Sequence, residues 1–281
     1  MTQTSKTSLI FKILHKYSVK PNKIMGQNFL IDENVLKKII EIANIKPKDT
    51  ILEVGPGLGI LTMELAKKAK CVIAIEKDKK LCEALKQILK NQKINNVKIV
   101  NKDVLKIQNS EIESKFKIQN YKIVANIPYY LTSPLIRKFL EIDNKPSEII
   151  LMVQKEVAER ICAQPPKMSL LAVSVQFYAK PEIVFSVSKN SFYPTPKVDS
   201  AIIKIVPQET PEIDVNKFFA IVKMGFSTKR KMLSNNLKSQ FQSSNVKSIL
   251  KNIELNPNIR AENLTIENWI KLYTELYYID T

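Results

Sequence analysis

The stretch Glu53–Gly59, with the sequence EVGPGLG, combines an acidic residue with three closely spaced glycines. It follows a short apolar run and precedes apolar residues at helical spacing, so we expect a turn between a strand and a helix. Glycines in such a turn let the backbone approach a ligand closely. The dinucleotide-binding pattern G-x-G-x-x-G would need a glycine where Ile60 stands. The spacing therefore favours a ligand without a pyrophosphate group.

Two further acids stand where the next two apolar runs end. Glu76 closes the second run, and Asp103 follows the third. An acid at the end of the second strand can accept hydrogen bonds from both hydroxyls of a ribose, and Asp103 is placed to reach an adenine amino group. Either acid alone is also explained as an ordinary surface carboxylate. With the glycine turn, they match the pattern of methyltransferases that use S-adenosylmethionine (SAM). We therefore predict SAM as the cofactor, bound by Gly55, Gly57, Glu76 and Asp103.

A fourth apolar run ends in Asn126-Ile127-Pro128-Tyr129. This segment is also compatible with a plain turn that ends a strand. Beside a SAM site, it resembles the [N/D]-x-P-[Y/F] element of methyltransferases that act on exocyclic amines of nucleobases. The Asn126 side chain and a main-chain carbonyl, that of Ile127, would accept both hydrogens of the amine, and Tyr129 would stack on the base. We therefore predict Asn126 and Tyr129 as catalytic residues, with Asn126 also next to SAM.

The elements that must position these residues alternate along the chain. Asp32 and Asp78 are placed to cap two amphipathic helices. The expected strands of a parallel sheet cover residues 51–54, 71–75, 97–100, 123–125 and 149–153. Residues 170–179 and 200–206 are interpreted as two more strands without a clear helix between them, so we expect antiparallel pairing at one edge of the sheet. Residues 214–281 show only helical periodicity.

This pattern predicts an α/β fold: a Rossmann-like class I SAM methyltransferase sheet with helices on both faces, plus a small all-α C-terminal domain. We place the methyltransferase domain at residues 1–208 and a helical RNA-binding domain at 209–281. Within the first domain, the helical and basic segment 1–48 is expected to close over the cofactor.

The charge balance points to a polyanionic partner. Lys and Arg number 44 against 27 Asp and Glu, a formal net charge of +17, and such an excess favours nucleic acid. Part of it is also explained by a composition rich in Lys, Asn and Ile. The cations Lys223, Lys229, Arg230 and Lys231 lie in a stretch poor in acids. We predict that they bind RNA phosphates, the alternative being a solvated helix face.

Composition also predicts where the protein acts. Cys71, Cys82 and Cys162 lack metal-ligand spacing, and His15 is the one histidine, so no metal site is expected. Few cysteines favour a reducing compartment, and no apolar run approaches the length of a membrane span. We therefore predict a cytoplasmic protein without a membrane partner. The N-terminal residues lack the features of a secretory signal, whereas an organelle transit peptide stays open.

Four segments together resemble one family over about residues 20–240. They are Lys23–Leu30, Asn126–Tyr129, Phe192–Ala201 and the run from Phe226 to Leu233. In combination they are similar to the KsgA family of small-subunit ribosomal RNA adenine N6,N6-dimethyltransferases.

The resemblance implies a function and further site residues. Gln27, Asn28 and Leu30 would join the cofactor site, and Phe192 would face Tyr129 across the target base. Without the resemblance, Phe192 reads as a core residue. The implied reaction is SAM-dependent dimethylation of two adjacent adenosines near the 3′ end of small-subunit (16S) rRNA during ribosome assembly. The implied partner is that rRNA or the immature small subunit, and we expect a monomer.

Relatives of the family leave alternatives open. Macrolide-resistance enzymes that methylate large-subunit rRNA share the SAM motifs and a similar Asn-Ile-Pro-Tyr element. A mitochondrial relative that aids transcription is a nucleic-acid-binding factor, against which the intact Asn126 and Tyr129 argue. A small-molecule methyltransferase is opposed by the charge and the helical domain. One departure from the family pattern is Tyr130, where a more polar residue, often Asn, is expected.

Overall fold

A computed structural model describes residues 16–17, 21, 26–108, 111, 120–238, 240–241 and 243–278. His15 and residues 23–25 of the N-terminal motif lie outside the described residues. The chain divides into two compact units. Unit 1 comprises residues 1–158 and 182–207, and unit 2 comprises 159–181 and 208–281. Residues 159–181 thus group with the C-terminal helices, whereas our sequence-based division kept them with the sheet.

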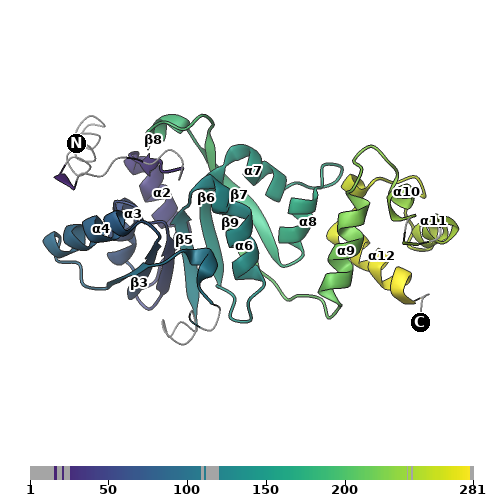
Figure 1. The fold of residues 1–281 in the computed structure, drawn as a ribbon, viewed down its shortest axis with the longest axis horizontal. Coiled ribbons are helices and arrows are strands. Elements are labelled where there is room, and N and C mark those ends of the chain that lie inside the picture. The colour runs from purple at the N-terminus through teal and green to yellow at the C-terminus, as the bar shows by residue number, and fades with distance from the viewer. Residues whose placement is uncertain are drawn as a thin grey trace. The chain divides into compact units, whose positions relative to one another are not determined.

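The described strands form a seven-stranded sheet, in the order β4-β3-β2-β5-β6-β9-β7, and a two-stranded sheet of β1 and β8 (Figure 1). The strands are β1 Phe29–Leu30, β2 Thr50–Val54, β3 Cys71–Glu76, β4 Val97–Asn101, β5 Tyr121–Asn126, β6 Glu148–Gln154, β7 Ala179–Val187, β8 Phe192–Tyr193 and β9 Ser200–Pro207. Neighbours from β4 to β6 pair parallel, and β9 pairs antiparallel with β6. The predicted parallel sheet is confirmed, and of the expected antiparallel edge the strand over residues 200–206 is confirmed.

Helices alternate with the strands of unit 1 because the sequence alternates between apolar runs and amphipathic, capped segments. The helices are α2 Glu33–Ala43, α3 Ile60–Ala66, α4 Lys79–Asn91, α6 Thr132–Leu140 and α7 Lys155–Ile161, the last of which ends in unit 2. The Asp32 and Asp78 side chains accept hydrogen bonds from the first turns of α2 and α4, as predicted.

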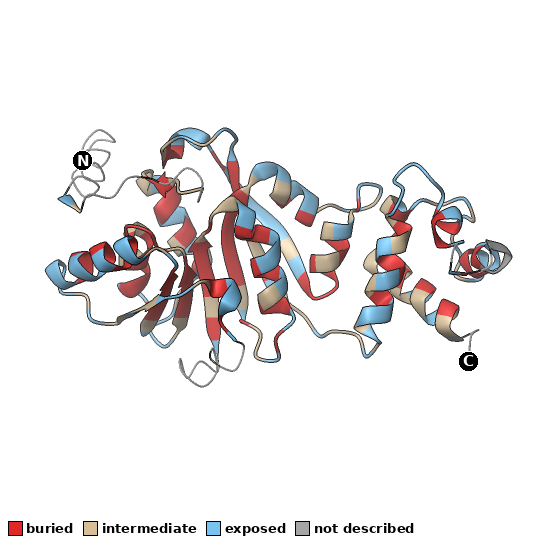
Figure 2. Cartoon of the chain, viewed as in Figure 1, coloured by how far each residue is buried: buried red, intermediate tan, exposed pale blue. Residues whose placement is uncertain are grey.

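Both faces of the sheet are covered. Five consecutive residues of β6 are buried, and the central strands are coloured as buried in Figure 2. Consecutive strand residues point to opposite faces of a sheet. On one face, Ile150 and Met152 pack in a cluster with residues of α2 and α3. The residues between and beside them, Ile149, Leu151 and Val153, are buried on the other face. The predicted doubly covered α/β fold is confirmed.

The strand order reverses at β2, which is the feature that positions the site. From β2 the chain proceeds to β3 and β4 on one side, and then returns to β5 and β6 on the other. Val54 lies opposite Ile75, so β2 and β3 end together, and β5 runs parallel to them. Ligands of open α/β sheets bind beyond the carboxyl ends of the strands at such a reversal.

Unit 2 contains the C-terminal helices predicted from the periodicity of residues 214–281. Its helices are α8 Leu170–Gln176, α9 Val215–Gly225, α10 Leu233–Leu237, α11 Ser243–Asn252 and α12 Ile266–Tyr278. Phe177, Phe218 and Phe219 form an aromatic cluster within it. None of the helices in the described part of the chain is long and apolar enough to cross a bilayer.

The expectation of a strand over residues 170–179 was wrong for most of its length. Residues 170–176 form α8, and β7 starts at Ala179. The Ser169 hydroxyl accepts a hydrogen bond from Ala172 N at 3.2 Å and caps the helix. A short run rich in Leu and Val is compatible with a buried strand and with a buried helix. Packing within unit 2 stabilises the helix.

Candidate active site

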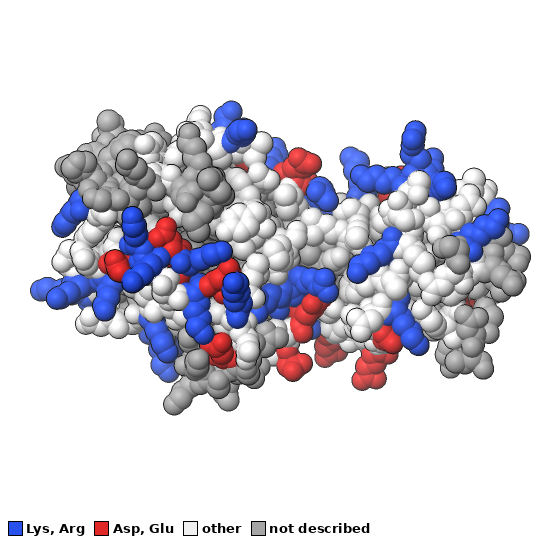
Figure 3. Space-filling view, viewed as in Figure 1, with Lys and Arg blue, Asp and Glu red and all other residues white. Residues whose placement is uncertain are grey.

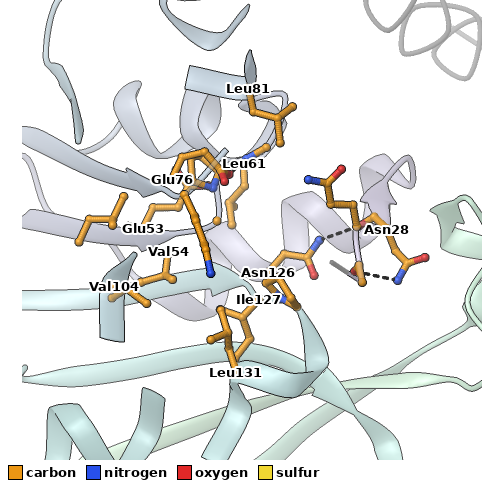
Figure 4. A pocket seen from close by; sticks show the side chains of 18 of the residues that line it. Asn28, Glu53, Val54, Leu61, Glu76, Leu81, Val104, Asn126, Ile127 and Leu131 are labelled. Carbon is orange, nitrogen blue, oxygen red and sulfur yellow. Dashed lines mark hydrogen bonds between the residues drawn. The ribbon is translucent and has the colours of Figure 1, made fainter. Parts of the chain in front are cut away.

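A pocket of about 330 Å³ lies where β2, β3 and β5 end. All ten residues predicted as catalytic or cofactor-binding line it. They are Gln27, Asn28, Leu30, Gly55, Gly57, Glu76, Asp103, Asn126, Tyr129 and Phe192. Figure 4 shows Glu53 and Glu76 on one side of the pocket and Asn28 and Asn126 on the other. The structure thus brings these side chains together, and their individual roles stay predictions.

The glycine turn adopts a backbone that favours glycine. Gly55 and Gly57 have φ of +69° and +58°, in the left-handed region. A Cβ on Gly57 would lie 3.1 Å from Cε1 of Phe29, and one on Gly55 would lie 3.5 Å from Cδ of Pro128. The positive φ would strain a side chain at either position. At Gly57 a side chain would also crowd Phe29, whereas at Gly55 the contact with Pro128 is an ordinary one. The turn therefore forms a cradle made of backbone.

Glu76 is fixed at the end of β3 with acceptor capacity to spare. Its side chain is buried, and its carboxylate accepts hydrogen bonds from Gly57 N at 3.2 Å and Asp78 N at 2.9 Å, one on each oxygen. Burial raises the pKa of the carboxyl above its usual value, against the effect of these N–H donors. Each carboxylate oxygen accepts more than one hydrogen bond, so both oxygens can still receive a pair of ligand hydroxyls.

Asp103 lies on the same wall, bound to a neighbouring cation. Its Oδ2 pairs with Lys77 Nζ at 3.0 Å, and its Oδ1 accepts a hydrogen bond from Leu105 N at 3.1 Å. Burial alone would raise the pKa of the Asp103 carboxyl, but Lys77 and the Leu105 N–H hold it below its usual value. Asp103 is therefore an ionised acceptor beside the pocket. Lys77 could not be identified from the sequence, since a lysine next to a glutamate is ordinary on a protein surface.

Glu53 is a pocket residue to which the sequence assigned no separate role. It is 1 % exposed, and its Oε2 has no hydrogen-bond partner among the described residues. Burial, reinforced by the nearby Glu76 charge, raises the pKa of Glu53 to about 8. A buried carboxyl with an unpaired oxygen in a pocket wall suits a ligand group that donates hydrogen bonds. Its place two residues before Gly55 was the available signal.

Asn126 presents an oriented amide. Its Nδ2 donates a hydrogen bond to the Asn28 carbonyl oxygen at 3.4 Å, drawn as a dashed line in Figure 4. Because the amide nitrogen is held there, Oδ1 is left to accept a hydrogen bond from a ligand. Ile127 also lines the pocket, as the prediction for its carbonyl requires. The arrangement suits the recognition of an amino group.

The two predicted aromatic walls are both fixed by neighbouring segments. The Tyr129 hydroxyl is 2.8 Å from Ser200 Oγ, and burial raises the pKa of this hydroxyl although Ser200 opposes the shift. Phe192 is 2 % exposed and belongs to the same buried cluster as Leu30. The two interpretations of Phe192, core residue and site residue, are therefore compatible, since its ring is buried in the wall of the pocket.

The predicted RNA-binding cations lie in unit 2. Lys223 is in the last turn of α9, and residues 229–231 form the turn before α10. All four side chains are exposed and make no ion pair with any described residue. Lys and Arg side chains are spread over the face drawn in Figure 3 and outnumber the acidic ones there.

Comparison with known proteins identifies the family. Residues 18–277 match the family of ribosomal RNA adenine dimethylases. The chain belongs to this family. The resemblance seen in the sequence motifs is thereby confirmed.

Individual relatives agree with the family match. The ribosomal RNA small subunit methyltransferase A of Dehalococcoides mccartyi is 45% identical, over 94% of this chain and 91% of that protein. Among solved structures, a dimethyladenosine transferase from Plasmodium falciparum matches with a TM-score of 0.77 and 29% identity, over 89% of this chain and 98% of the other. The 23S rRNA methyltransferase ErmE matches with a TM-score of 0.72 and 26% identity, over 89% and 100%. The predicted fold class is confirmed by these neighbours.

The raised pKa of Glu53 predicts a pH-dependent stability. Unfolding releases the proton that burial holds, because the carboxyl ionises near 4.5 in the unfolded chain and near 8 in the folded protein. The free energy of unfolding should therefore fall as the pH rises from about 4.5 to about 8. Glu53→Gln cannot ionise, so its stability relative to wild type should grow over this range by up to a few kcal/mol, at ~1.4 kcal/mol per pKa unit.

Urea unfolding of both proteins at pH 5 and pH 8.5 measures this difference. Glu83→Gln, at an exposed position of α4, controls for the loss of a carboxylate. If the free energy of unfolding changed equally with pH in wild type and in Glu53→Gln, Glu53 would have an ordinary pKa.

Proposed function

We propose that this protein transfers methyl groups from SAM to the N6 atoms of two adjacent adenosines near the 3′ end of small-subunit (16S) rRNA during ribosome assembly. The observation that carries the proposal is the oriented amide of Asn126, in one pocket with a ribose-type acceptor, Glu76, and two aromatic residues, Tyr129 and Phe192. The names of the relatives agree: a small-subunit rRNA methyltransferase and a dimethyladenosine transferase.

The residues present fit SAM. The sulfonium of bound SAM supplies an activated methyl group. The backbone cradle of Gly55 and Gly57 admits the cofactor closely, the free lone pairs of Glu76 suit its ribose hydroxyls, and the ionised Asp103 suits its adenine amino group. On this assignment, the orphaned carboxyl of Glu53 meets a donor group of the amino-acid part.

The rest of the pocket suits the acceptor amine. The N6 lone pair of adenine is delocalised into the ring, which makes the amine a poor nucleophile. Asn126 Oδ1 and the Ile127 carbonyl would each accept one amine hydrogen, which orients the nitrogen and favours the charge that develops on it. Tyr129 and Phe192 would hold the extracted base by stacking. Because SAM is already activated, the chain needs no nucleophilic side chain.

The helical unit would supply the affinity for RNA. Lys223, Lys229, Arg230 and Lys231 are exposed and unpaired among the described residues, as phosphate-binding cations must be. Small-subunit rRNA or the immature subunit is the partner on this proposal. The monomeric state and the cytoplasmic location expected from the sequence stay predictions.

A large-subunit substrate is the second candidate, because the fold match to a 23S rRNA methyltransferase extends over 89% of this chain. Labelled SAM, incubated with small subunits that lack the modification and with large subunits in parallel, separates the two. We expect label in N6,N6-dimethyladenosine of the small-subunit rRNA. Label in large-subunit rRNA alone would refute the proposal.

SAM affinity should depend on Glu76. In Glu76→Ala, the loss of two ribose hydrogen bonds should cost about 1–3 kcal/mol, a ten- to hundredfold weaker affinity by calorimetry. Glu83→Ala removes an exposed carboxylate from the neighbouring helix and should bind SAM normally. Wild-type affinity in Glu76→Ala would exclude the ribose role.

Turnover should depend on Asn126 more than SAM binding does. Its Oδ1 is assigned to the amine as charge develops, so Asn126→Ala should lower the single-turnover rate by ~100-fold or more. SAM affinity, measured on the same sample, should change much less. A rate within about threefold of wild type would remove Asn126 from the reaction.

Neutralising Lys229, Arg230 and Lys231 to Ala should weaken RNA binding and its dependence on salt. The slope of log affinity against log salt concentration should fall by ~2–3 units, because each phosphate contact contributes ~0.7–0.9. A matched triple variant of exposed lysines on α4, Lys80, Lys86 and Lys90 to Ala, controls for net charge. An unchanged slope with intact helix content would make the run a solvated surface.

A further inference from the structure

The N-terminal segment that lines the pocket is paired with the loop that carries Phe192. In the two-stranded sheet, Phe29 lies opposite Tyr193 and Leu30 opposite Phe192, antiparallel. The pairing continues beyond the strands, since Ile31 N donates to the Ser191 carbonyl oxygen at 2.8 Å. Each strand has two residues, and isolated pairs of short strands are marginally stable. Something else must hold this pair together.

Apolar packing and a side-chain hydrogen bond do so. Leu30 and Phe192 belong to one buried cluster. The Ser191 hydroxyl donates a hydrogen bond to Asp32 Oδ2 at 2.9 Å, and Ser191 is buried. The other oxygen of Asp32, Oδ1, caps α2 by accepting from Asn34 N at 2.9 Å. Asp32 thus uses its two oxygens for two different elements. It fixes the loop of Phe192 to the start of a helix in the core of unit 1.

The two segments that this hydrogen bond connects line the parts of the pocket predicted for the two ligands, the cofactor and the target base. Asn28 and Leu30, just before Asp32, line the pocket with the cofactor residues, and Phe192, just after Ser191, lines it as a wall for the base. On the other side of the loop, Lys189 N donates to Asp199 Oδ1 at 2.9 Å. A ligand that fixes Asn28 and Leu30 therefore also restricts Phe192.

We propose that the Ser191–Asp32 hydrogen bond couples the binding of the methyl donor to the binding of the target base, with Ser191 and Asp32 as positioning residues. The proposal rests on the proposed function, in that it takes Asn28 and Leu30 as cofactor contacts and Phe192 as a base contact. Binding of the donor orders Phe192, so the base subsequently meets a wall that has already lost its freedom of movement.

Coupling of this kind is reciprocal, and its usual size is about 5–150-fold in affinity. The donor should tighten RNA binding by the same factor by which RNA tightens donor binding. Because the connection consists of one side-chain hydrogen bond, a short backbone pairing and the packing of Leu30 and Phe192 in one cluster, we expect the low end of that range, about fivefold. Ser191→Ala removes the side-chain hydrogen bond and leaves the apolar packing and the helix cap of Asp32 in place.

The first experiment needs no RNA. Hydrogen exchange is followed by mass spectrometry in the wild-type full chain, with and without S-adenosylhomocysteine. We expect slower exchange at 29–31 and also at 189–193. In Ser191→Ala, the ligand should still slow exchange at 29–31. At 189–193, the exchange rate with ligand should be within about twofold of the rate without ligand. Ser188→Ala, whose exposed hydroxyl bonds within the same loop to Asn190 N, is the matched control and should behave as wild type.

The second experiment measures affinity for small subunits that lack the modification, with and without S-adenosylhomocysteine. The gain from the ligand should be about fivefold in wild type and in Ser188→Ala, and within about twofold of unity in Ser191→Ala. Asp32→Ser keeps an N-cap oxygen but has no second one for Ser191, so it should lose the gain as well. Thermal unfolding of each variant confirms that it is folded.

The outcomes separate the two proposals. Wild-type protein that binds neither S-adenosylhomocysteine nor the subunits would refute the proposed function and the coupling with it. Wild-type protein that binds both, but without protection at 189–193 and without a gain in affinity, would refute the coupling alone. A gain that persists unchanged in Ser191→Ala and Asp32→Ser would also refute it.

Discussion

Parallel strands that lie side by side in a sheet must end at the same edge, and the whole pocket depends on this constraint. β2, β3 and β5 deliver the glycine turn, Glu76 and Asn126 to one edge, although these residues are far apart in the sequence. The pairing even extends into the turn, where Gly55 N donates to the Ile75 carbonyl oxygen at 2.9 Å. That bond fixes the height of the turn relative to Glu76, whose carboxylate then accepts from Gly57 N.

The same edge concentrates groups that are costly to bury. Glu53 and Glu76 are both under 8 % exposed and lie close enough for the charge of Glu76 to raise the pKa of Glu53. Two backbone N–H groups compensate Glu76, whereas Glu53 retains an unpaired oxygen and stays neutral at pH 7. A core built for stability alone would replace such a pair with apolar residues. Their retention beside a cavity is better explained by a ligand that supplies the missing partners.

Features that depend on neighbouring residues could be predicted from the sequence, whereas features that depend on contacts between distant residues could not. The strands of the sheet were predictable because burial on both faces demands unbroken apolar runs. The turn was predictable because a backbone at positive φ favours glycine, which the sequence shows directly. Residues 170–176 were not, since their apolar run fits a helix equally well and contacts distant in the chain decide. Lys77 and Ser191 were not predicted for a related reason. Their roles depend on contacts with Asp103 and Asp32, which are distant in the sequence and are brought close by the fold.

The two aromatic walls are positioned differently from the acids. Glu76 and Asn126 end strands of the large sheet, and the sheet itself holds them. Tyr129 lies in a short 3₁₀ turn and Phe192 in a two-residue strand, and such elements have little stability of their own. Each wall is instead connected to the body of unit 1 through a buried serine, Ser200 for Tyr129 and Ser191 for Phe192.

That difference suits a division of labour between the two ligands of the proposed reaction. On that proposal the cofactor needs a rigid site, because its ribose and adenine would be recognised by hydrogen bonds with strict geometry. A base must first enter between two rings, which requires that the rings can separate. Short elements would let the two walls separate in the absence of the donor, and the hydrogen bonds of Ser200 and Ser191 would hold the walls in place once both ligands are bound. On the same proposal, phosphate contacts elsewhere would supply most of the affinity for RNA, so the pocket could remain open to the base without weakening the complex.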